Sequence, residues 1–191
     1  MGAWDAGRLI EWMWISLGAY WIVSARRIKR RKLGESTLTY SWLSLPMIAA
    51  VLLLAGGEFW RGALRAPLAP TSSLFQDSGV VLTLAGVLLA AWARYHLGAN
   101  WSAVPSIRMG HELIRTGPYK HLRHPIYSGI LLAALGSALV INQRRAALGF
   151  VLLWIGFALK AKREENLLGA EFGAQFEEHK QHTGFPFPRF S

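Results

Sequence analysis

The chain has 191 residues, of which 52% are apolar and only 17% are charged, and its mean hydropathy is +0.25. This composition excludes an intrinsically disordered chain, and it leaves too little polar surface to cover a soluble globule. The lack of cysteine excludes disulfides, zinc–thiolate sites, iron–sulfur clusters and a thiol nucleophile. The net charge of +10 would indicate nucleic-acid binding only if the basic residues formed one soluble face.

Charge-poor runs alternate with charge clusters along the chain, and together they predict an all-α integral membrane protein with about five transmembrane helices. The runs cover residues 9–25, 42–57, 79–93, 126–141 and 146–159. The last two are shorter than the roughly 17 residues that a perpendicular span needs, so we expect a tight hairpin that turns at residues 142–145. Pro125 would lie in the first turn of the fourth helix, where its missing N–H costs nothing. No run alternates with a period of two for long, so no strands are expected.

The distribution of basic residues predicts an orientation. Five spans place successive connections on alternate sides of the membrane, and one side then receives 16 of the 21 Lys and Arg residues. By the positive-inside rule the N-terminus lies outside and the C-terminus is cytoplasmic, in what we expect to be a bacterial inner membrane. The basic cluster at residues 26–32 is interpreted as a stop-transfer signal, with a patch for nucleic acid or anionic lipid as the alternative.

Polar groups gather in the segments that would face the cytoplasm. Four of the six histidines lie between His96 and His124, and the adjacent carboxylates Glu164 and Glu165 follow the fifth run. Ionisable groups concentrated at one membrane face indicate a functional site. We therefore divide the chain into residues 1–76, with two anchoring spans, and residues 77–191, a catalytic region with three spans, a cytoplasmic loop and a C-terminal helix.

Three motifs carry a resemblance to a known family. They are Gly-His-Glu-Leu-Ile-Arg-Thr-Gly-Pro-Tyr at residues 110–119, Arg-His-Pro-Ile-Tyr-Ser-Gly at 123–129, and Glu-Glu-x-x-Leu at 164–168. In this order they resemble the isoprenylcysteine carboxyl methyltransferase family over roughly residues 94–188, about half the chain. That family contains integral-membrane enzymes that use S-adenosylmethionine, and its C-terminal half is similar to phospholipid N-methyltransferases.

The resemblance implies a methyl transfer from S-adenosylmethionine to a lipophilic acceptor that enters from the bilayer, with S-adenosylhomocysteine as the product. The acceptor most directly implied is the carboxylate of an isoprenylcysteine-type substrate. The implied cofactor contacts fall on His111, Glu112, Leu113, Ile114, Tyr119, His124, Pro125, Ile126, Tyr127 and Glu164. Membrane lipids are expected partners, and nucleic acid and metal ions are not.

The residues themselves suit this cofactor. The chain contains no Gly-x-Gly turn of the kind that soluble methyltransferases commonly use. Glu164 or Glu165 could instead bind the ribose diol or the ammonium group, and His111 with Tyr119 could frame the adenine. The free N–H groups after His124, at the start of a helix, would face the methionine carboxylate.

Lys160, Arg123 and Glu165 are the candidate catalytic residues. In the family, the basic residue four positions before the motif's first glutamate faces the acceptor and is typically Arg in the eukaryotic enzymes; here it is Lys160, a point charge rather than a bidentate fork. We expect Lys160 and Arg123 to orient the acceptor. A carboxylate acceptor needs no general base, whereas an amine would need one, from Glu165 or His124. The glutamine that contacts the cofactor in the family is missing here, and Val104 lies near its place.

Simpler interpretations stay open at this point. His124 could be a polar helix cap, the adjacent glutamates a solvated helix end, and Tyr119 and Tyr127 interfacial aromatics. His96, His121, His179 and His182 have no convincing metal-ligand spacing. The competing functions are N-methylation of a phospholipid amine, an NADPH-dependent reduction of the sterol-reductase type, and a non-catalytic membrane scaffold.

Overall fold

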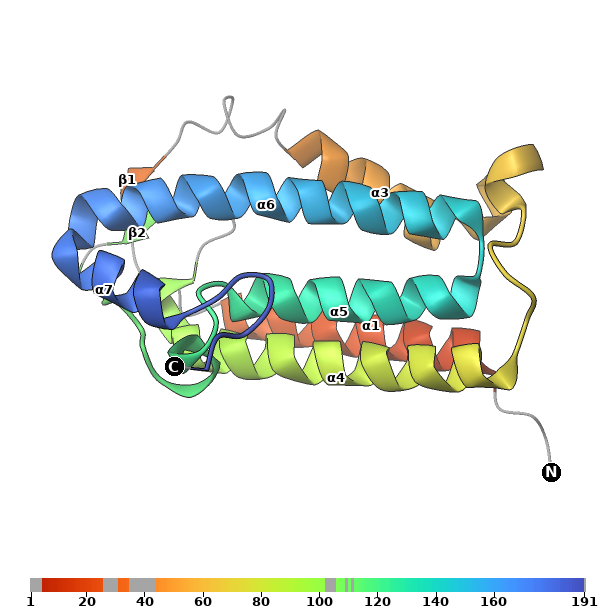
Figure 1. The fold of residues 1–191 in the computed structure, drawn as a ribbon, viewed down its shortest axis with the longest axis horizontal. Helices are drawn as coiled ribbons and strands as arrows, with labels where there is room; N and C mark the ends of the chain where they lie inside the picture. Colours follow the sequence, from red (N-terminus) through yellow and green to blue (C-terminus); the bar gives the residue numbers. More distant parts are fainter. Residues whose placement is uncertain are drawn as a thin grey trace.

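In the part of the chain that the structure describes, helices α1, α3, α4, α5 and α6 run side by side in alternating directions and form two layers (Figure 1). The computed structural model describes residues 5–25, 31–34, 44–101, 106–108, 110 and 112–190. One layer holds α3 and α6, and the other holds α1, α4 and α5. The helices are α1 (Ala6–Ser24), α3 (Leu45–Ala55), α4 (Ser73–Leu97), α5 (Pro125–Ile141), α6 (Arg144–Phe172) and the short α7 (Ala174–His182). Short 3-10 helices occupy η3 (Gly57–Phe59), η4 (Gly62–Arg65), η5 (Gly98–Asn100) and η6 (Gly117–Lys120).

The predicted helical order is confirmed, and so is the hairpin between the last two runs. Pro125 is the first residue of α5, and Asn142 ends that helix in the left-handed conformation, with φ 46° and ψ 43°. The Asn142 side chain donates to the Ala69 carbonyl at 2.7 Å and accepts from the Ala69 N–H at 3.2 Å. These bonds to a neighbouring loop fix the turn, and α6 begins two residues later.

The expectation of no strands is wrong in one place. Strand β1 (Arg31–Gly34) pairs antiparallel with β2 (Ser106–Arg108), with an irregular register between Arg31 and Leu33. Strands of four and three residues are too short to show a period of two, and their pairing depends on distant parts of the chain. The small sheet joins the segment after α1 to the segment after α4.

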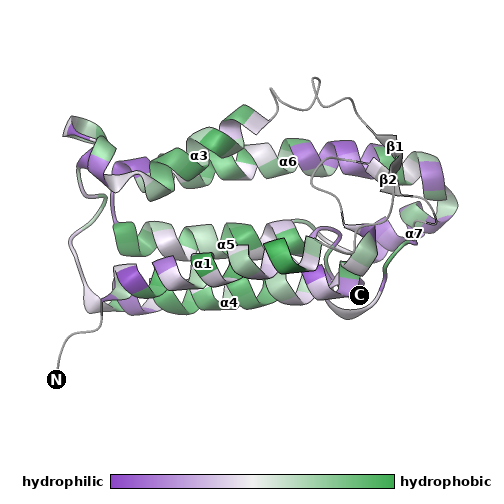
Figure 2. Cartoon of the chain, turned by 180° about the vertical axis from the view of Figure 1, so that it is seen from behind, coloured by the Kyte–Doolittle hydropathy of each residue, from purple (hydrophilic) through white to green (hydrophobic). Residues whose placement is uncertain are grey.

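Apolar residues predominate along the middle of the helices, and hydrophilic residues are more frequent toward their ends (Figure 2). Among the described residues, one helical stretch, Ser73–Asn100, is long and apolar enough to cross a membrane, with a mean hydropathy of 1.7. Helices α3 and α5 are apolar but shorter. Large exposed apolar side chains, such as Leu84 and Leu88 on α4, are consistent with an apolar environment around the bundle.

Helices α4 and α5 pack with their backbones in close approach, because small residues meet along the contact. A Cβ added to Gly86 would overlap the backbone of Gly129 and Ala133, and one added to Gly129 would lie 2.6 Å from the Ala90 nitrogen. The buried Thr83 hydroxyl donates to the Gly79 carbonyl at 2.8 Å, and no bulky group separates the helices there. Small residues of this kind allow tight helix association where the surroundings are as apolar as the helices.

Two buried arginines join helix ends at opposite ends of the bundle. Arg94 donates to the carbonyls of Ser24 and Gly98, each at 2.7 Å, and so links the ends of α1 and α4. Arg145, at the start of α6, donates to the Leu53 and Leu54 carbonyls at the end of α3. The last carbonyls of a helix have no intrahelical donor, so these guanidinium groups satisfy them while they fix neighbouring helices together.

The close approach of α4 and α5 predicts opposite effects for two glycine-to-alanine substitutions. Alanine in a helix is favoured over glycine by about 0.5–1 kcal/mol. Gly18→Ala should raise the unfolding temperature slightly, since no atom lies within 4 Å of its added Cβ. Gly86→Ala should lower the unfolding temperature, because α4 and α5 must separate, at a cost of about 1–3 kcal/mol. Thermal unfolding of both variants in detergent measures this, and equal effects would contradict the packing described.

Candidate active site

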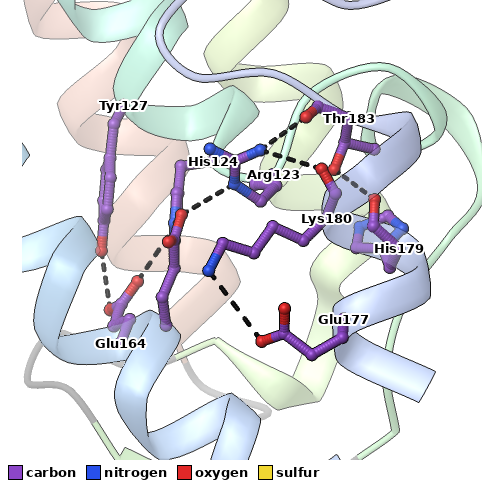
Figure 3. A network of polar contacts seen from close by, with 9 residues as sticks. Arg123, His124, Tyr127, Glu164, Glu177, His179, Lys180 and Thr183 are labelled. Atoms are coloured by element: carbon purple, nitrogen blue, oxygen red, sulfur yellow. Dashed lines mark hydrogen bonds and ion pairs between the residues drawn. The ribbon is translucent and has the colours of Figure 1, made fainter. Parts of the chain in front are cut away.

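A buried histidine lies between two carboxylates at one end of the bundle (Figure 3). His124 immediately precedes α5, and its Nε2 lies 3.2 Å from Oε1 of Glu165. Its Nδ1 lies 3.5 Å from Oε2 of Glu164. Helix α6 does not end at residue 159 but continues to Phe172, so a rigid helix holds both carboxylates. The histidine is therefore not a free helix cap, and the glutamates are not a solvated helix end.

An aromatic stack lies next to this cluster. The Tyr127 hydroxyl donates to Oε1 of Glu164 at 2.7 Å, and the Tyr127 ring stacks on His124 with centroids 5.3 Å apart. On its other side the ring stacks on Phe157, with centroids 4.7 Å apart. The Lys160 ammonium lies 5.2 Å from the Tyr127 centroid. Phe157, Lys160 and Glu164 recur at helical spacing, which places them on one face of α6.

Arg123 connects the carboxylates to the C-terminal segment. Its Nε donates to Oε1 of Glu165 at 2.7 Å, and its Nη1 donates to the carbonyls of Thr183 and Lys180. The Arg123 backbone N–H also donates to the Gly184 carbonyl at 3.0 Å. The guanidinium is thus engaged by a carboxylate and by the backbone of the segment that follows α7.

The C-terminal segment continues across the start of α5. The Ser128 hydroxyl donates to the Pro186 carbonyl at 2.8 Å, and the Phe185 ring meets His124 edge to face, with centroids 5.2 Å apart. The Gly184 N–H donates to the His121 carbonyl at 3.0 Å. These contacts help to bury the His124 ring, and the residue is only 6% exposed.

The cluster shifts the pKa values of its members in opposite directions. Burial acts to lower the pKa of His124, but hydrogen bonds and the charges of Glu164 and Glu165 outweigh it and raise the pKa. Burial acts to raise the pKa of each carboxyl, but the pairing lowers the pKa of Glu164 and brings that of Glu165 to about 2. Burial, with the charge of Glu164, raises the pKa of Tyr119. The site therefore favours an imidazolium between two carboxylates, beside a neutral phenol.

A pocket with a cavity volume of about 100 Å³, partly open to solvent, adjoins the cluster. The predicted site residues that line it are Tyr119, Arg123, His124, Ile126, Tyr127 and Glu164. Lys160 and Glu165 contact members of this set without lining the pocket, and Pro125 is buried in the first turn of α5. Glu112, Leu113 and Ile114 precede η6 and do not line the pocket; His111 and Val104 lie outside the described residues.

Six further residues line the same pocket and received no role from sequence reasoning: Leu97, Asn100, Trp101, Ser106, Leu167 and Leu168. Leu97, Asn100 and Trp101 occupy the turn after α4, which Gly98 makes possible with its φ of 52°. The sequence signal that could have indicated these residues is the Asn-Trp pair that follows Gly98, shortly before the motif at residues 110–119. Across the described residues, no group of three or more His, Asp and Glu side chains could hold a metal ion.

The low pKa of Glu165 predicts a pH-dependent contribution to stability. With a pKa of about 2 against 4.5 in an ordinary environment, ionised Glu165 stabilises the folded state above about pH 4.5, and this is lost as the pH falls toward 2. Glu165→Gln should cost about 2 kcal/mol at pH 7 and weaken the loss of stability in acid. Thermal unfolding from pH 3 to 7 measures both effects. Glu58→Gln, exposed at the other end of the bundle, is the control, and matching pH profiles for the two variants would refute the assignment.

Comparison with known proteins places these residues in a family context. Residues 79–170 match the sequence model of the isoprenylcysteine carboxyl methyltransferase family. A probable protein-S-isoprenylcysteine O-methyltransferase from Oryza sativa subsp. indica is 33% identical over 114 residues, which are 57% of this chain and 60% of the relative. Protein-S-isoprenylcysteine O-methyltransferase B of Arabidopsis thaliana is 32% identical over 114 residues, 57% of this chain and 58% of the relative.

A third relative is similar over a longer stretch of the chain. The protein-S-isoprenylcysteine O-methyltransferase of Schizosaccharomyces pombe is 26% identical over 149 residues, which are 73% of this chain and 63% of the relative. The chain spans about three fifths of the length of these relatives. The matched region contains Arg123, His124, Tyr127, Lys160 and both glutamates of the cluster. The resemblance predicted from the motifs is therefore confirmed: residues 79–170 match the sequence model of the isoprenylcysteine carboxyl methyltransferase family.

Proposed function

We propose that this chain is an integral-membrane methyltransferase of that family, which transfers a methyl group from S-adenosylmethionine to the carboxylate of an isoprenylcysteine-type lipid. One observation carries the proposal: the cluster of His124, Tyr127 and Glu164 lies within the matched region and opens on a pocket. The relatives described above bear the name of this O-methylation. The products are a methyl ester and S-adenosylhomocysteine.

The residues that line the pocket fit the cofactor in chemistry. Glu164 presents a carboxylate suited to a ribose diol or an ammonium group. In the first turn of α5 the N–H group of Ile126 lacks an intrahelical acceptor, which suits a carboxylate. Trp101 and Tyr119 offer flat apolar walls for a base. When bound, the cofactor supplies a methyl group on an electrophilic sulfonium.

The charges in the site favour a carboxylate acceptor over an amine. Glu164 and Glu165 have lowered pKa values and the pKa of His124 is raised, so none of the three is prepared to accept a proton near pH 7. Burial with nearby arginines lowers the pKa of His179 to about 4, but His179 does not line the pocket. An amine must lose a proton before it attacks, whereas a carboxylate is already a nucleophile.

Lys160 is the group that we assign to the acceptor carboxylate. Its ammonium lies over the Tyr127 ring, beside the pocket, and its charge lowers the pKa of Glu164. Arg123 lines the pocket, but its guanidinium is engaged with Glu165 and two carbonyls, which suits a positioning role. The aromatic rings of Tyr127, Phe157 and Phe185 exclude water from the neighbouring charges, which strengthens their interactions.

We also propose that the five long helices cross a membrane, with the site on the cytoplasmic side. The alternating helix directions, the apolar outer surface and the 16 basic residues expected at the end that carries the site support this orientation. A bacterial inner membrane and contacts with its lipids remain predictions. Helix α1 packs on α4 and α3 packs on α6, so residues 1–76 would anchor and cover a catalytic region at 77–191.

Cofactor binding tests the first part of the proposal. Calorimetry on the detergent-purified protein should show binding of S-adenosylhomocysteine, and Glu164→Gln should weaken it about 10–100-fold, because a charged hydrogen-bond acceptor is lost. Glu58→Gln should bind like the wild type. Binding of NADPH instead would favour the reductase, and binding of neither ligand to folded protein would favour the scaffold.

Acceptor kinetics test the second part. With N-acetyl-S-farnesylcysteine as acceptor, Lys160→Met should raise the acceptor KM at least 10-fold and change the Kd of S-adenosylhomocysteine less than 3-fold. Lys160→Arg should retain the acceptor affinity, since its guanidinium also pairs with a carboxylate. Lys162→Met, two residues away and exposed, is the matched control. Methylation of phosphatidylethanolamine in place of the farnesylcysteine would contradict the assigned acceptor.

A further inference from the structure

Asn100, which lines the pocket, has a buried side-chain oxygen that no other described residue pairs with. It is the last residue of η5, and the residue is only 7% exposed. Its Oδ1 is buried and has no hydrogen-bond partner among the described residues. A buried acceptor without a partner costs about 1–3 kcal/mol, so such atoms are few in folded proteins and call for an explanation. A ligand donor in the pocket would satisfy this oxygen.

The backbone around Asn100 is held firmly. Gly98 ends α4 with a positive φ, and its N–H donates to the Arg94 carbonyl. The Arg94 guanidinium donates to the Gly98 carbonyl at 2.7 Å and lies 5.0 Å from the centroid of the Trp101 ring. Asn100 therefore lies between two anchored neighbours, and its amide is positioned before any ligand arrives. Such positioning lowers the entropic cost of binding.

The surroundings of Asn100 suit an aromatic base rather than a charged group. Leu97, Trp101 and Ile126 line the same pocket with apolar and aromatic surface, and the anionic group of the pocket is Glu164. A carboxylate suits hydroxyls and ammonium groups, whereas a neutral amide matches the amine and ring nitrogen at one edge of adenine. We therefore expect the two residues to bind different parts of the ligand, Glu164 its hydroxyl or ammonium groups and Asn100 its base.

We propose that Asn100 accepts a hydrogen bond from the exocyclic amine of the adenine ring, and so selects an adenine base. The assignment rests on the proposed function, since it takes the ligand of this pocket to be an adenosyl cofactor. Asn100 would then be a binding residue outside the three motifs that carry the family resemblance. Replacing the 6-amino group with hydrogen leaves the rest of the ligand unchanged, so the loss in affinity reports on this contact.

The test compares S-adenosylhomocysteine with the analogue in which hydrogen replaces the 6-amino group, by calorimetry on the full chain in detergent. The wild type should bind the amine-containing ligand at least 10-fold more tightly. Asn100→Leu should weaken that ligand at least 10-fold and change the analogue less than 3-fold, so the preference disappears. Asn166→Leu is the control, because Asn166 is exposed on α6 beside Glu164 and does not line the pocket.

The outcomes separate this assignment from the proposed function. Equal affinity of the wild type for both ligands, or an equal loss of both in Asn100→Leu, overturns the role of Asn100 and leaves the cofactor site in place. No binding of either ligand to folded wild type overturns the proposed function together with this assignment. If Asn100→Leu does not fold, as judged by its unfolding temperature, Asn100→Ala takes its place in the same comparison.

Discussion

The ion cluster around His124 is the constraint on which the site depends. Burying charged groups is costly unless they are paired and hydrogen-bonded. The imidazole at the start of α5 must therefore meet the two carboxylates on α6, and the guanidinium of Arg123 must meet Glu165. Only one register of α5 against α6 satisfies all of these groups. The same register places Tyr127 between His124 and Phe157 and positions the wall of the pocket.

The rest of the bundle supports this register from a distance. The close contact of α4 with α5 fixes α5 along its length, because the glycine and alanine residues leave no space for sliding or tilting. Arg94 and Arg145 join helix ends at the two ends of the bundle. The C-terminal segment then covers the start of α5 through Ser128 and Phe185. Close backbone packing along α5 and side-chain contacts at its start thus hold different parts of the same helix in place.

The sequence allowed much of this arrangement to be predicted, and particular residues show why the rest could not be. Apolar runs located the five long helices, and the special backbone properties of Pro125 and the 142–145 turn located the hairpin. The motifs contribute His124, Tyr127 and Glu164, which all line one pocket in the structure. The short strands gave no periodic signal, and the engagement of Arg123 depends on a carbonyl sixty residues away. The burial of Asn100, and the absence of a partner for its oxygen among the described residues, are properties of the folded chain.

The length of α6 has a consequence for how this chain can change. Its 29 residues correspond to about 43 Å, so one continuous helix holds the carboxylates at the end of the bundle. In a continuous helix, a change in length alters the rotation of every later side chain about the helix axis as well as its position. One residue inserted between Phe157 and Glu164 would turn both carboxylates by about 100° away from His124. This stretch of helix therefore has a fixed rotational phase, and a change in its length would separate the carboxylates from His124.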